Sequence, residues 1–308
     1  MEETKLALAI VIALTGSGTG ALLAQPNNAC HFSVSFTRPD EGGTRSVRVF
    51  EGRSEPALHG MKPLLFVVPD VKVNTDGTKI SYKVDDPRAR NGAINDIRNA
   101  MRAGHTIAEF EQLAQNDWQP LTRTWQVLSS AVIEKDRRTG KPCVTADNFL
   151  VSMTADVSVA GARDRVGDCD QTKWIDALTV PALVLPGGSQ FQAKGAKTRS
   201  FVVAMTLKGP ERIAFGIVGD TGPAKELGEA SVEMNRILNG LPDNDKPNSN
   251  SDAVRRFQGP KSVILIFPGS ENRLAHPVTA ERVQSEVEAR FDAWGGKPRL
   301  AACLHEIP

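Results

Sequence analysis

The stretch IAFGIVGDTGPAKELGEAS, residues 213–231, decides how the middle of this chain folds. It opens with six mostly apolar residues, a pattern that predicts a buried β-strand. Glycines and a proline then indicate a loop, and Ser231 at its end is a good N-cap for a helix. The segment therefore places two carboxylates, Asp220 and Glu229, between the end of a strand and the start of a helix.

Two carboxylates on rigid supports can perform acid–base chemistry. One carboxylic acid protonates a glycosidic oxygen while the other, as a carboxylate, activates a water molecule. The plainer alternative is a solvated helical face, because Glu226, Glu229 and Glu233 share one side if the whole stretch is helical. A Gly-Pro step and a further glycine before Glu229 interrupt such a helix. This interruption favours the acid–base interpretation.

Other apolar runs of strand length occur along the chain, and Pro-Gly turns follow two of them. Short strands separated by turns are typical of a small barrel. We therefore expect an α+β fold in which a small, β-rich, six-stranded barrel is decorated with helices. The further predicted strands are residues 64–68, 148–153, 182–185, 201–205 and 263–267.

Helix signals flank these strands. Thr106, with Glu109 three residues later, forms a capping-box pattern, and Ser231 and Thr279 are N-cap candidates. The polar stretch 242–258 is expected to be a long surface loop. The helices for which the sequence predicts both a start and an end are residues 89–103, 232–239 and 280–294.

An Asp-Gly pair lies between two short alternating runs, residues 71–73 and 80–84. Such a pair is a strong hairpin signal. A cation-binding loop is the alternative, because Asn74, Asp76 and Thr78 stand at alternate positions. The glycine is misplaced for a helix-loop-helix calcium site, which favours the plain turn.

Charge and cysteine content limit the classes of function. The 308 residues include 37 basic and 36 acidic side chains, a net charge of +1. Because phosphate binding requires a basic excess, nucleic acid is not an expected partner. The four cysteines form no CxxC pair and the five histidines are scattered, so no metal and no cofactor is predicted.

An apolar run covers residues 6–24 and is expected to be a signal peptide ending at Ala24 or a short retained anchor. We therefore expect a secreted or periplasmic protein that contacts a membrane only if the anchor is retained. In an exported chain one or two disulfides are plausible, with three possible full pairings. Beyond the leader we expect an N-terminal β/α region, residues 25–140, which is either separate or integral, and a catalytic region, residues 141–308.

Two motifs of this chain resemble the signature of the family-75 glycoside hydrolases, secreted chitosanases known mainly from fungi. They are Gly-Asp-Thr at residues 219–221 and Gly-Glu-Ala-Ser at residues 228–231. The similarity covers about residues 148–270 and includes an Asp-Cys-Asp at 168–170. It implies that Asp220 and Glu229 are the catalytic pair and that cleavage inverts the anomeric centre.

A fainter resemblance concerns the double-psi β-barrels, and it rests on residues 176–181, the strands after them and the Gly-Asp-Thr-Gly at 219–222. That barrel also carries a catalytic aspartate in lytic transglycosylases that act on peptidoglycan. The likeness implies a double-psi-like core and offers peptidoglycan as a competing substrate.

Together these observations predict endo-acting, inverting hydrolysis of an amino-sugar polysaccharide, chitosan in particular. We assign Glu229 as general acid and Asp220 as general base. The alternatives are a lytic transglycosylase, which needs one carboxylate, and a noncatalytic glycan-binding envelope protein. The expected substrate-binding residues are the acids, which would hold cationic sugar rings, and a tryptophan that either stacks on a ring or packs in the core: Asp168, Asp170, Asp176 and Trp174.

Overall fold

The computed structural model describes residues 30–40, 42–188, 190–222 and 227–307, so the expected leader and Glu226 lie outside the described residues. The strands are β1 (Ser33–Pro39), β2 (Ser46–Glu51), β3 (Leu64–Val68), β4 (Lys72–Asn74), β5 (Ala182–Pro186), β6 (Phe201–Thr206), β7 (Ile213–Gly222), β8 (Glu229–Ser231) and β9 (Ser262–Phe267). The α-helices are α1 (Ile107–Gln115), α2 (Leu121–Val127), α3 (Gln190–Ala193), α4 (Val232–Asn239), α5 (Asn250–Phe257), α6 (Ala280–Trp294) and α7 (Gly296–Glu306).

These strands form one mixed sheet in the order β1-β2-β3-β9-β6-β7-β5-β8-β4. The β5–β7 and β4–β8 pairs are parallel, whereas the other pairs are antiparallel. The α+β class predicted from the sequence is therefore confirmed. The sheet contains β1–β4, which precede residue 140, and β5–β9, which follow it. The two regions expected on either side of residue 140 therefore share one sheet.

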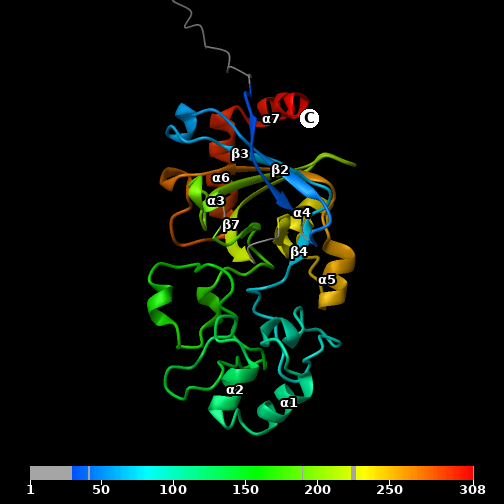
Figure 1. Ribbon diagram of the computed structural model, residues 1–308, viewed down its shortest axis with the longest axis vertical. Coiled ribbons are helices and arrows are strands. Elements are labelled where there is room, and N and C mark those ends of the chain that lie inside the picture. The colour runs from blue at the N-terminus through cyan, green and yellow to red at the C-terminus, as the bar shows by residue number, and fades with distance from the viewer. Residues whose placement is uncertain (1–29, 41, 189, 223–226, 308) are drawn as a thin grey trace, which may run out of the picture.

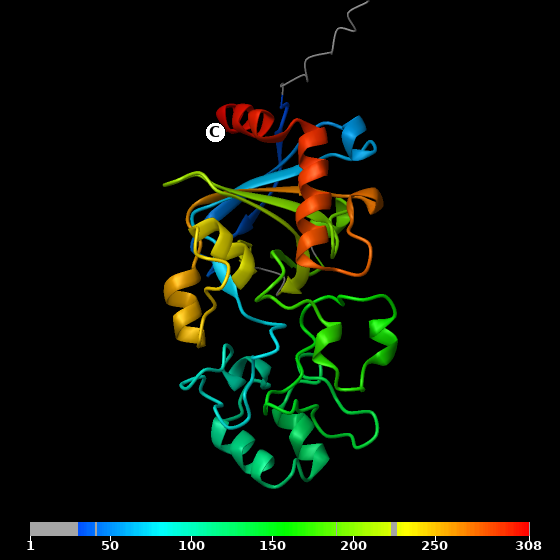
Figure 2. The same ribbon diagram turned by 180° about the vertical axis from the view of Figure 1, so that it is seen from behind.

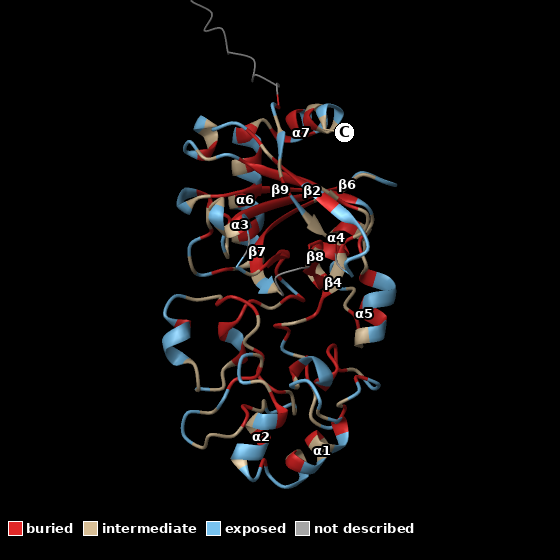
Figure 3. Ribbon diagram, in the orientation of Figure 1, coloured by how far each residue is buried: buried red, intermediate tan, exposed pale blue. Residues whose placement is uncertain are grey.

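The central strands are buried on both faces, which explains why they read as continuous apolar runs. In β6, Val203 and Met205 pack towards α6, while Val202 and Ala204 pack in a second core with Met234 of α4. Figure 2 shows α6 lying against the face of the sheet that carries Val203 and Met205. Figure 3 shows that the buried residues are concentrated in the strands.

The expected closed barrel is not confirmed, because β1 and β4 are the two edges of the sheet among the described residues. Nevertheless β3 and β4 are consecutive, and Val71 between them forms an isolated bridge with Gly259, shortly before β9. Thus β3 pairs with β9 in the middle of the sheet, whereas β4, which follows it in the chain, pairs with β8 at the far edge.

Residues 75–174 form the lower part of the molecule in Figure 1, below the sheet. This part contains α1, α2 and short 3-10 turns, and otherwise isolated bridges. Its side chains make two small apolar cores of their own. The disulfide Cys143–Cys169 lies here, whereas Cys30–Cys303 joins the start of the described chain to α7.

Several local predictions are confirmed. Thr106 and Glu109 form both hydrogen bonds of the capping box of α1. Ser231 accepts a hydrogen bond from the backbone of Met234 and caps α4, and Thr279 caps α6 in the same way. None of the described helices is long and apolar enough to span a membrane.

The predicted hairpin at residues 71–84 is wrong. The first arm, β4, pairs in parallel with β8, and the second arm forms no strand. The loop between them packs elsewhere: a Cβ added to Gly77 would lie 2.7 Å from the Cβ of Ala155. Long-range packing has therefore replaced the local pairing that the Asp-Gly step favours.

Three further predictions are corrected. Residues 89–103 contain only the 3-10 turn Ile97–Ala100, because the Asp86 carboxylate binds backbone N–H groups of Arg90, Asn91 and Ala93 and holds them in a loop. Residues 148–153 form isolated bridges instead of a strand. The stretch 242–258 includes α5, which Ser249 caps.

Candidate active site

Asp220 and Glu229 lie on either side of one residue of the sheet. Val184 of β5 pairs with Asp220 of β7 on one side and with Glu229 of β8 on the other. Residues that pair across neighbouring strands direct their side chains to the same face. The two carboxylates therefore share a face with one strand between them.

A β-bulge sets the direction of Asp220. The register between β5 and β7 shifts so that Leu183 pairs with Val218 and Val184 pairs with Asp220, which leaves Gly219 unpaired. A Cβ at Gly219 would lie 2.6 Å from the Cβ of Ala182, so the close approach requires glycine. Bulges redirect side chains in this way beside active sites.

Glu229 is held by the neighbouring strand. The Nδ2 of Asn74 in β4 donates a 3.0 Å hydrogen bond to Glu229 Oε1. A Cβ added to Gly222 would lie 3.0 Å from Val184 Cγ1 and 4.0 Å from Glu229 Oε2. The glycine of the Gly-Asp-Thr-Gly motif thus leaves room next to this carboxylate.

The surroundings of Asp220 favour its protonated form. Burial raises its pKa to about 7, and the negative charges of Asp76 and Asp156 add to this effect. The backbone N–H of Thr221 donates a 2.6 Å hydrogen bond to Asp220 Oδ1 and acts in the opposite direction. Strongly shifted pKa values of this kind are concentrated at functional sites.

A third carboxylate, Asp76, accepts hydrogen bonds through Oδ1 from the Tyr82 hydroxyl and from Asn95 Nδ2. The Asn95 amide also lies 3.0 Å from the tyrosine oxygen. Tyr82 is fully buried and has a φ of 62°, which is uncommon for an aromatic residue. The lower part of the molecule thus supplies an ordered polar group to the end of the sheet.

Asn74, Asp76 and Asp220 meet at a small pocket where the sheet adjoins the lower part, and Glu229 is not among its described lining residues. Its accessible space is about 10 Å³, room for about one water molecule. Among the lining residues two are acidic and none is basic. They are Asn74, Asp76, Ala155, Ile175, Ala177, Ala182, Leu183, Val184, Gly219, Asp220 and Ser231.

Two of the four expected sugar-binding residues belong to an ion cluster away from this pocket. Asp168 pairs with the fully buried Lys173, and the same ammonium lies 2.7 Å from the buried Glu134. Arg165 lies 3.6 Å from Asp168 and 3.5 Å from Asp170. Although burial opposes it, the Lys173 hydrogen bond lowers the pKa of Asp168.

The assignment of Trp174 to sugar stacking is corrected: the side chain is 2% exposed and packs in a small core. Arg163 and Lys173 both lie within 6 Å of its ring. Asp176 is half-buried, and its Oδ1 accepts a 3.0 Å hydrogen bond from the backbone of Leu178. Burial raises its pKa, but Asp176 does not line the pocket.

Arg212 and Arg236, which flank the two motifs in the sequence, bind groups other than Asp220 and Glu229. Arg236 binds Glu233 and Asp243, and Arg212 Nη1 donates to the backbone oxygen of Leu238. Within the described residues, no group of three His, Cys, Asp or Glu side chains is placed to hold a metal ion.

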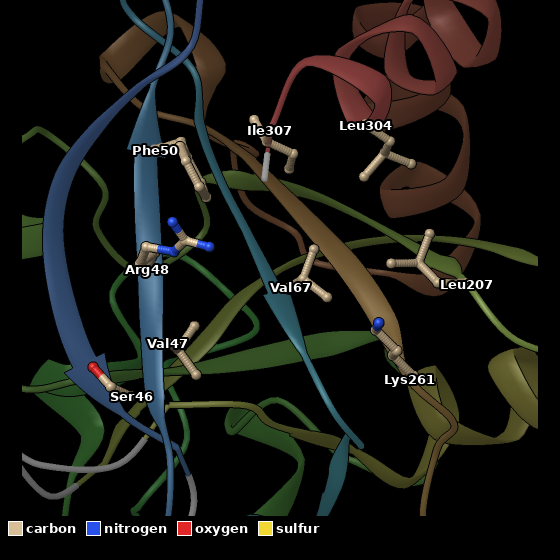
Figure 4. Close-up of a pocket in the computed structure, with 9 residues that line it drawn as sticks. All are labelled: Ser46, Val47, Arg48, Phe50, Val67, Leu207, Lys261, Leu304 and Ile307. Carbon is tan, nitrogen blue, oxygen red and sulfur yellow. The ribbon is translucent and has the colours of Figure 1, made fainter.

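A larger cavity of about 420 Å³ lies between β2, β3, β9 and α7 (Figure 4). Arg48 and Lys261 are its charged lining residues, and the lining includes no carboxylate. This cavity therefore lacks the groups needed for acid–base catalysis.

Sequence reasoning found Asp220 and Glu229 but not their partners. The sequence predicts a turn at Asn74 and Asp76 and a short strand that contains Tyr82, whereas the structure places Asn74 in β4 and Tyr82 outside any strand. The signal in the sequence is the alternation of polar side chains at Asn74, Asp76 and Thr78. This alternation indicates a site only when β4 is known to lie beside β8.

Comparisons with models of known protein families and with curated protein sequences find no match.

Proposed function

We propose that this protein is a glycoside hydrolase that cleaves an amino-sugar polysaccharide, chitosan in particular, with inversion. The observation that carries the proposal is the pairing of Val184 with both Asp220 and Glu229. Adjacent strands lie about 4.8 Å apart, so the two backbone positions are separated by about 9.6 Å. This backbone separation favours the wider carboxyl spacing of inverting enzymes, about 6.5–9.5 Å, over the spacing of about 5–5.5 Å in retaining enzymes.

The local chemistry reverses the roles assigned from the sequence. A carboxyl group with a pKa of about 7 is largely protonated in mildly acidic solution, so Asp220 is the general acid. Glu229 accepts a hydrogen bond from the Asn74 amide, which favours a carboxylate. Glu229 is therefore the general base that activates water while Asp220 protonates the leaving oxygen.

The preference for amino sugars rests on charge. Among the described residues, the pocket is lined by Asp76 and Asp220 and by no lysine or arginine. The negative charge of these carboxylates favours a cationic sugar ring beside the pocket over an anionic one. Because the net charge of the whole chain is near zero, this attraction is local.

The same proposal includes the finer fold and the compartment. The continuity of β3 with β4, together with the Val71–Gly259 bridge, supports a double-psi-like arrangement of β3/β4, β9, β6, β7, β5 and β8. Two disulfides fit an oxidising compartment, as expected for a secreted or periplasmic enzyme.

A lytic transglycosylase acting on peptidoglycan is the second candidate. It is favoured by one observation: Asp220, with a pKa of about 7, can donate and then accept a proton by itself. In that reaction Glu229 is dispensable and the products carry 1,6-anhydro ends.

The test is release of reducing ends from chitosan, and separately from peptidoglycan, by the wild-type protein, Asp220→Asn and Glu229→Gln. We expect both substitutions to abolish chitosan cleavage while circular dichroism stays unchanged. The matched control is Asp147→Asn, an exposed carboxylate of the lower part, which should retain activity.

Proton NMR of the first products reports the anomer, and inversion is expected. A well-folded wild-type protein inactive on chitosan contradicts the proposal. Anhydro products from peptidoglycan, formed also by Glu229→Gln, favour the transglycosylase. If both substrates are bound but neither is cleaved, the noncatalytic alternative is the better account.

A further inference from the structure

Asp76 is brought to Asp220 by tertiary packing. The backbone of Asp220 forms an isolated bridge with Ala155, and Gly77 packs directly against that alanine. Gly77 has a φ of +76°, and an added Cβ would also lie 3.1 Å from the carbonyl oxygen of Ile175. The loop that carries Asp76 is thus seated on the backbone beside Asp220, and both carboxylates line the same pocket.

The loop is fixed in this position by buried polar contacts. Ser81 donates a 2.9 Å hydrogen bond to the carbonyl oxygen of Thr75 and contacts Thr78. The backbone N–H of Tyr82 donates to Asn95, and the carbonyl of Tyr82 accepts from Leu150. Tyr82 keeps an unfavourable backbone conformation, with a φ of 62°, while its hydroxyl contacts Asp76.

The two carboxylates at the pocket have different partners. Burial raises the pKa of Asp76, and the hydrogen bonds from the Tyr82 hydroxyl and the Asn95 amide oppose that rise by stabilising the charged form. Asp220 accepts one backbone N–H. Two carboxylates that share a site do not both ionise readily, so the one with more donors holds the negative charge and the other holds the proton.

Other charged groups face Asp220 as well. Asp156 is paired with Arg163 and Arg199, at 2.9 Å and 3.3 Å, so much of its charge is compensated. Glu229 shares the face of the sheet across Val184. Unlike Asp156, Asp76 accepts hydrogen bonds from uncharged groups, so no cation bound to it within the described residues cancels its field at Asp220.

We infer that Asp76, held as an anion by Tyr82 and Asn95, is a positioning residue that keeps the proton on Asp220. In the proposed reaction Asp76 does not contact the bond that breaks. It maintains the general acid in its protonated state between turnovers and restores that state after the proton is given to the leaving group. The inference rests on the proposed function for its catalytic meaning, but the protonation itself is measurable without substrate.

The experiment is a carbon-13 NMR titration of aspartate carboxyl groups in the full chain, with Asp220 assigned by the signal missing in Asp220→Asn. In the wild type we expect Asp220 to titrate near pH 7. In Asp76→Asn its pKa should fall by about one unit or more, because a like charge is removed. Tyr82→Phe should give a smaller fall, since the charge of Asp76 is then less well stabilised.

Asp176→Asn is the matched control, because Asp176 is also half-buried near the pocket but is not bound to Tyr82. This substitution should leave the pKa of Asp220 unchanged. An unchanged Asp220 titration in both Asp76→Asn and Tyr82→Phe overturns the inference. If Asp76→Asn does not fold, Tyr82→Phe alone decides.

Activity separates this inference from the proposed function. With chitosan, the alkaline limb of kcat/KM should move to lower pH in Asp76→Asn by the same amount as the NMR titration. If Asp76 had only a structural role, Asp76→Asn would lower kcat without shifting the alkaline limb of the pH profile. That result overturns the inference. A shifted titration in a protein that cleaves no glycan leaves the inference standing and refutes the hydrolase.

Discussion

Asp220 on β7 and Glu229 on β8 occupy equivalent positions in the sheet, one strand apart, because both pair with the same residue of β5. A parallel pair on one side of β5 and an antiparallel pair on the other bring them together. The nine-residue spacing in the sequence thus becomes a fixed spacing across the sheet. Their distance is set by strand geometry and is insensitive to the loop between them.

The pH dependence of activity should identify the acid. With Asp220 as general acid, kcat/KM on chitosan falls about tenfold per pH unit above about pH 7, since the proton is lost there. With the roles reversed, activity would instead rise through pH 7. Initial rates between pH 4 and 9 distinguish these two results.

Asp220→Asn should stabilise the protein at neutral and alkaline pH. The native pKa of about 7 lies above the ordinary value of 3.8, so the native state binds the proton more tightly than the unfolded state. The associated stability is complete below about pH 4 and is lost as the pH rises through 7. Because the residue is partly exposed, we expect a gain of about 1–2 kcal/mol in the free energy of unfolding at pH 8.

Urea unfolding of wild type and Asp220→Asn at pH 4 and pH 8 measures this difference. At pH 4 the two proteins should unfold at more similar urea concentrations, because Asp220 is then neutral in the native state and only partly ionised in the unfolded state. An equal difference at both pH values would argue against a raised pKa of Asp220.

Glu134→Gln should destabilise the lower part of the molecule without a specific effect on the KM for substrate. Its carboxylate accepts from Lys173, from the backbone of Gly167 and Cys169, and from Trp174. Weakening a buried ion pair by removing one charge costs about 3 kcal/mol or more. Asp168→Asn, in the same cluster but partly exposed, should cost about 1 kcal/mol.

Thermal unfolding checks the Glu134 and Asp168 variants, and KM for chitosan is the second readout. A large rise in KM for Asp168→Asn at unchanged stability would restore Asp168 as a sugar-binding residue. An unchanged KM with a lower Tm is the expected result.

Removal of the Cys143–Cys169 bridge should abolish activity at elevated temperature before the sheet unfolds. The bridge closes a sequence separation of 26 residues in a part with little regular secondary structure. Loops of this size contribute about 3 kcal/mol by restricting the unfolded chain. Since Asp76 and Tyr82 belong to this part, loosening it should disturb the site.

The variant Cys143→Ala/Cys169→Ala, followed by activity and by hydrogen exchange, makes this test, with Cys30→Ala/Cys303→Ala as its counterpart. Faster exchange confined to residues 75–174 is expected for the first variant. Uniform loosening of the sheet would show that the lower part does not unfold separately.

Much of the sheet was predictable because it depends on local composition. The runs in β3, β5, β6, β7 and β9 are apolar enough to be recognised as buried strands, and the caps Thr106, Ser231 and Thr279 act through neighbouring backbone groups. The short strands β4 and β8 have three residues each and no such pattern. Their pairing depends on contacts between residues more than 150 positions apart.

The sequence by itself determined the central strands, the helix caps and the two carboxylates Asp220 and Glu229, since apolar runs, capping side chains and glycine breaks act over a few residues. Only the tertiary structure decided that β5 separates those carboxylates, that Asp76, bound by Tyr82, lines a pocket with Asp220, and that Trp174 is buried. These outcomes depend on sheet order and on burial, which are set by the free energy of the whole packed chain.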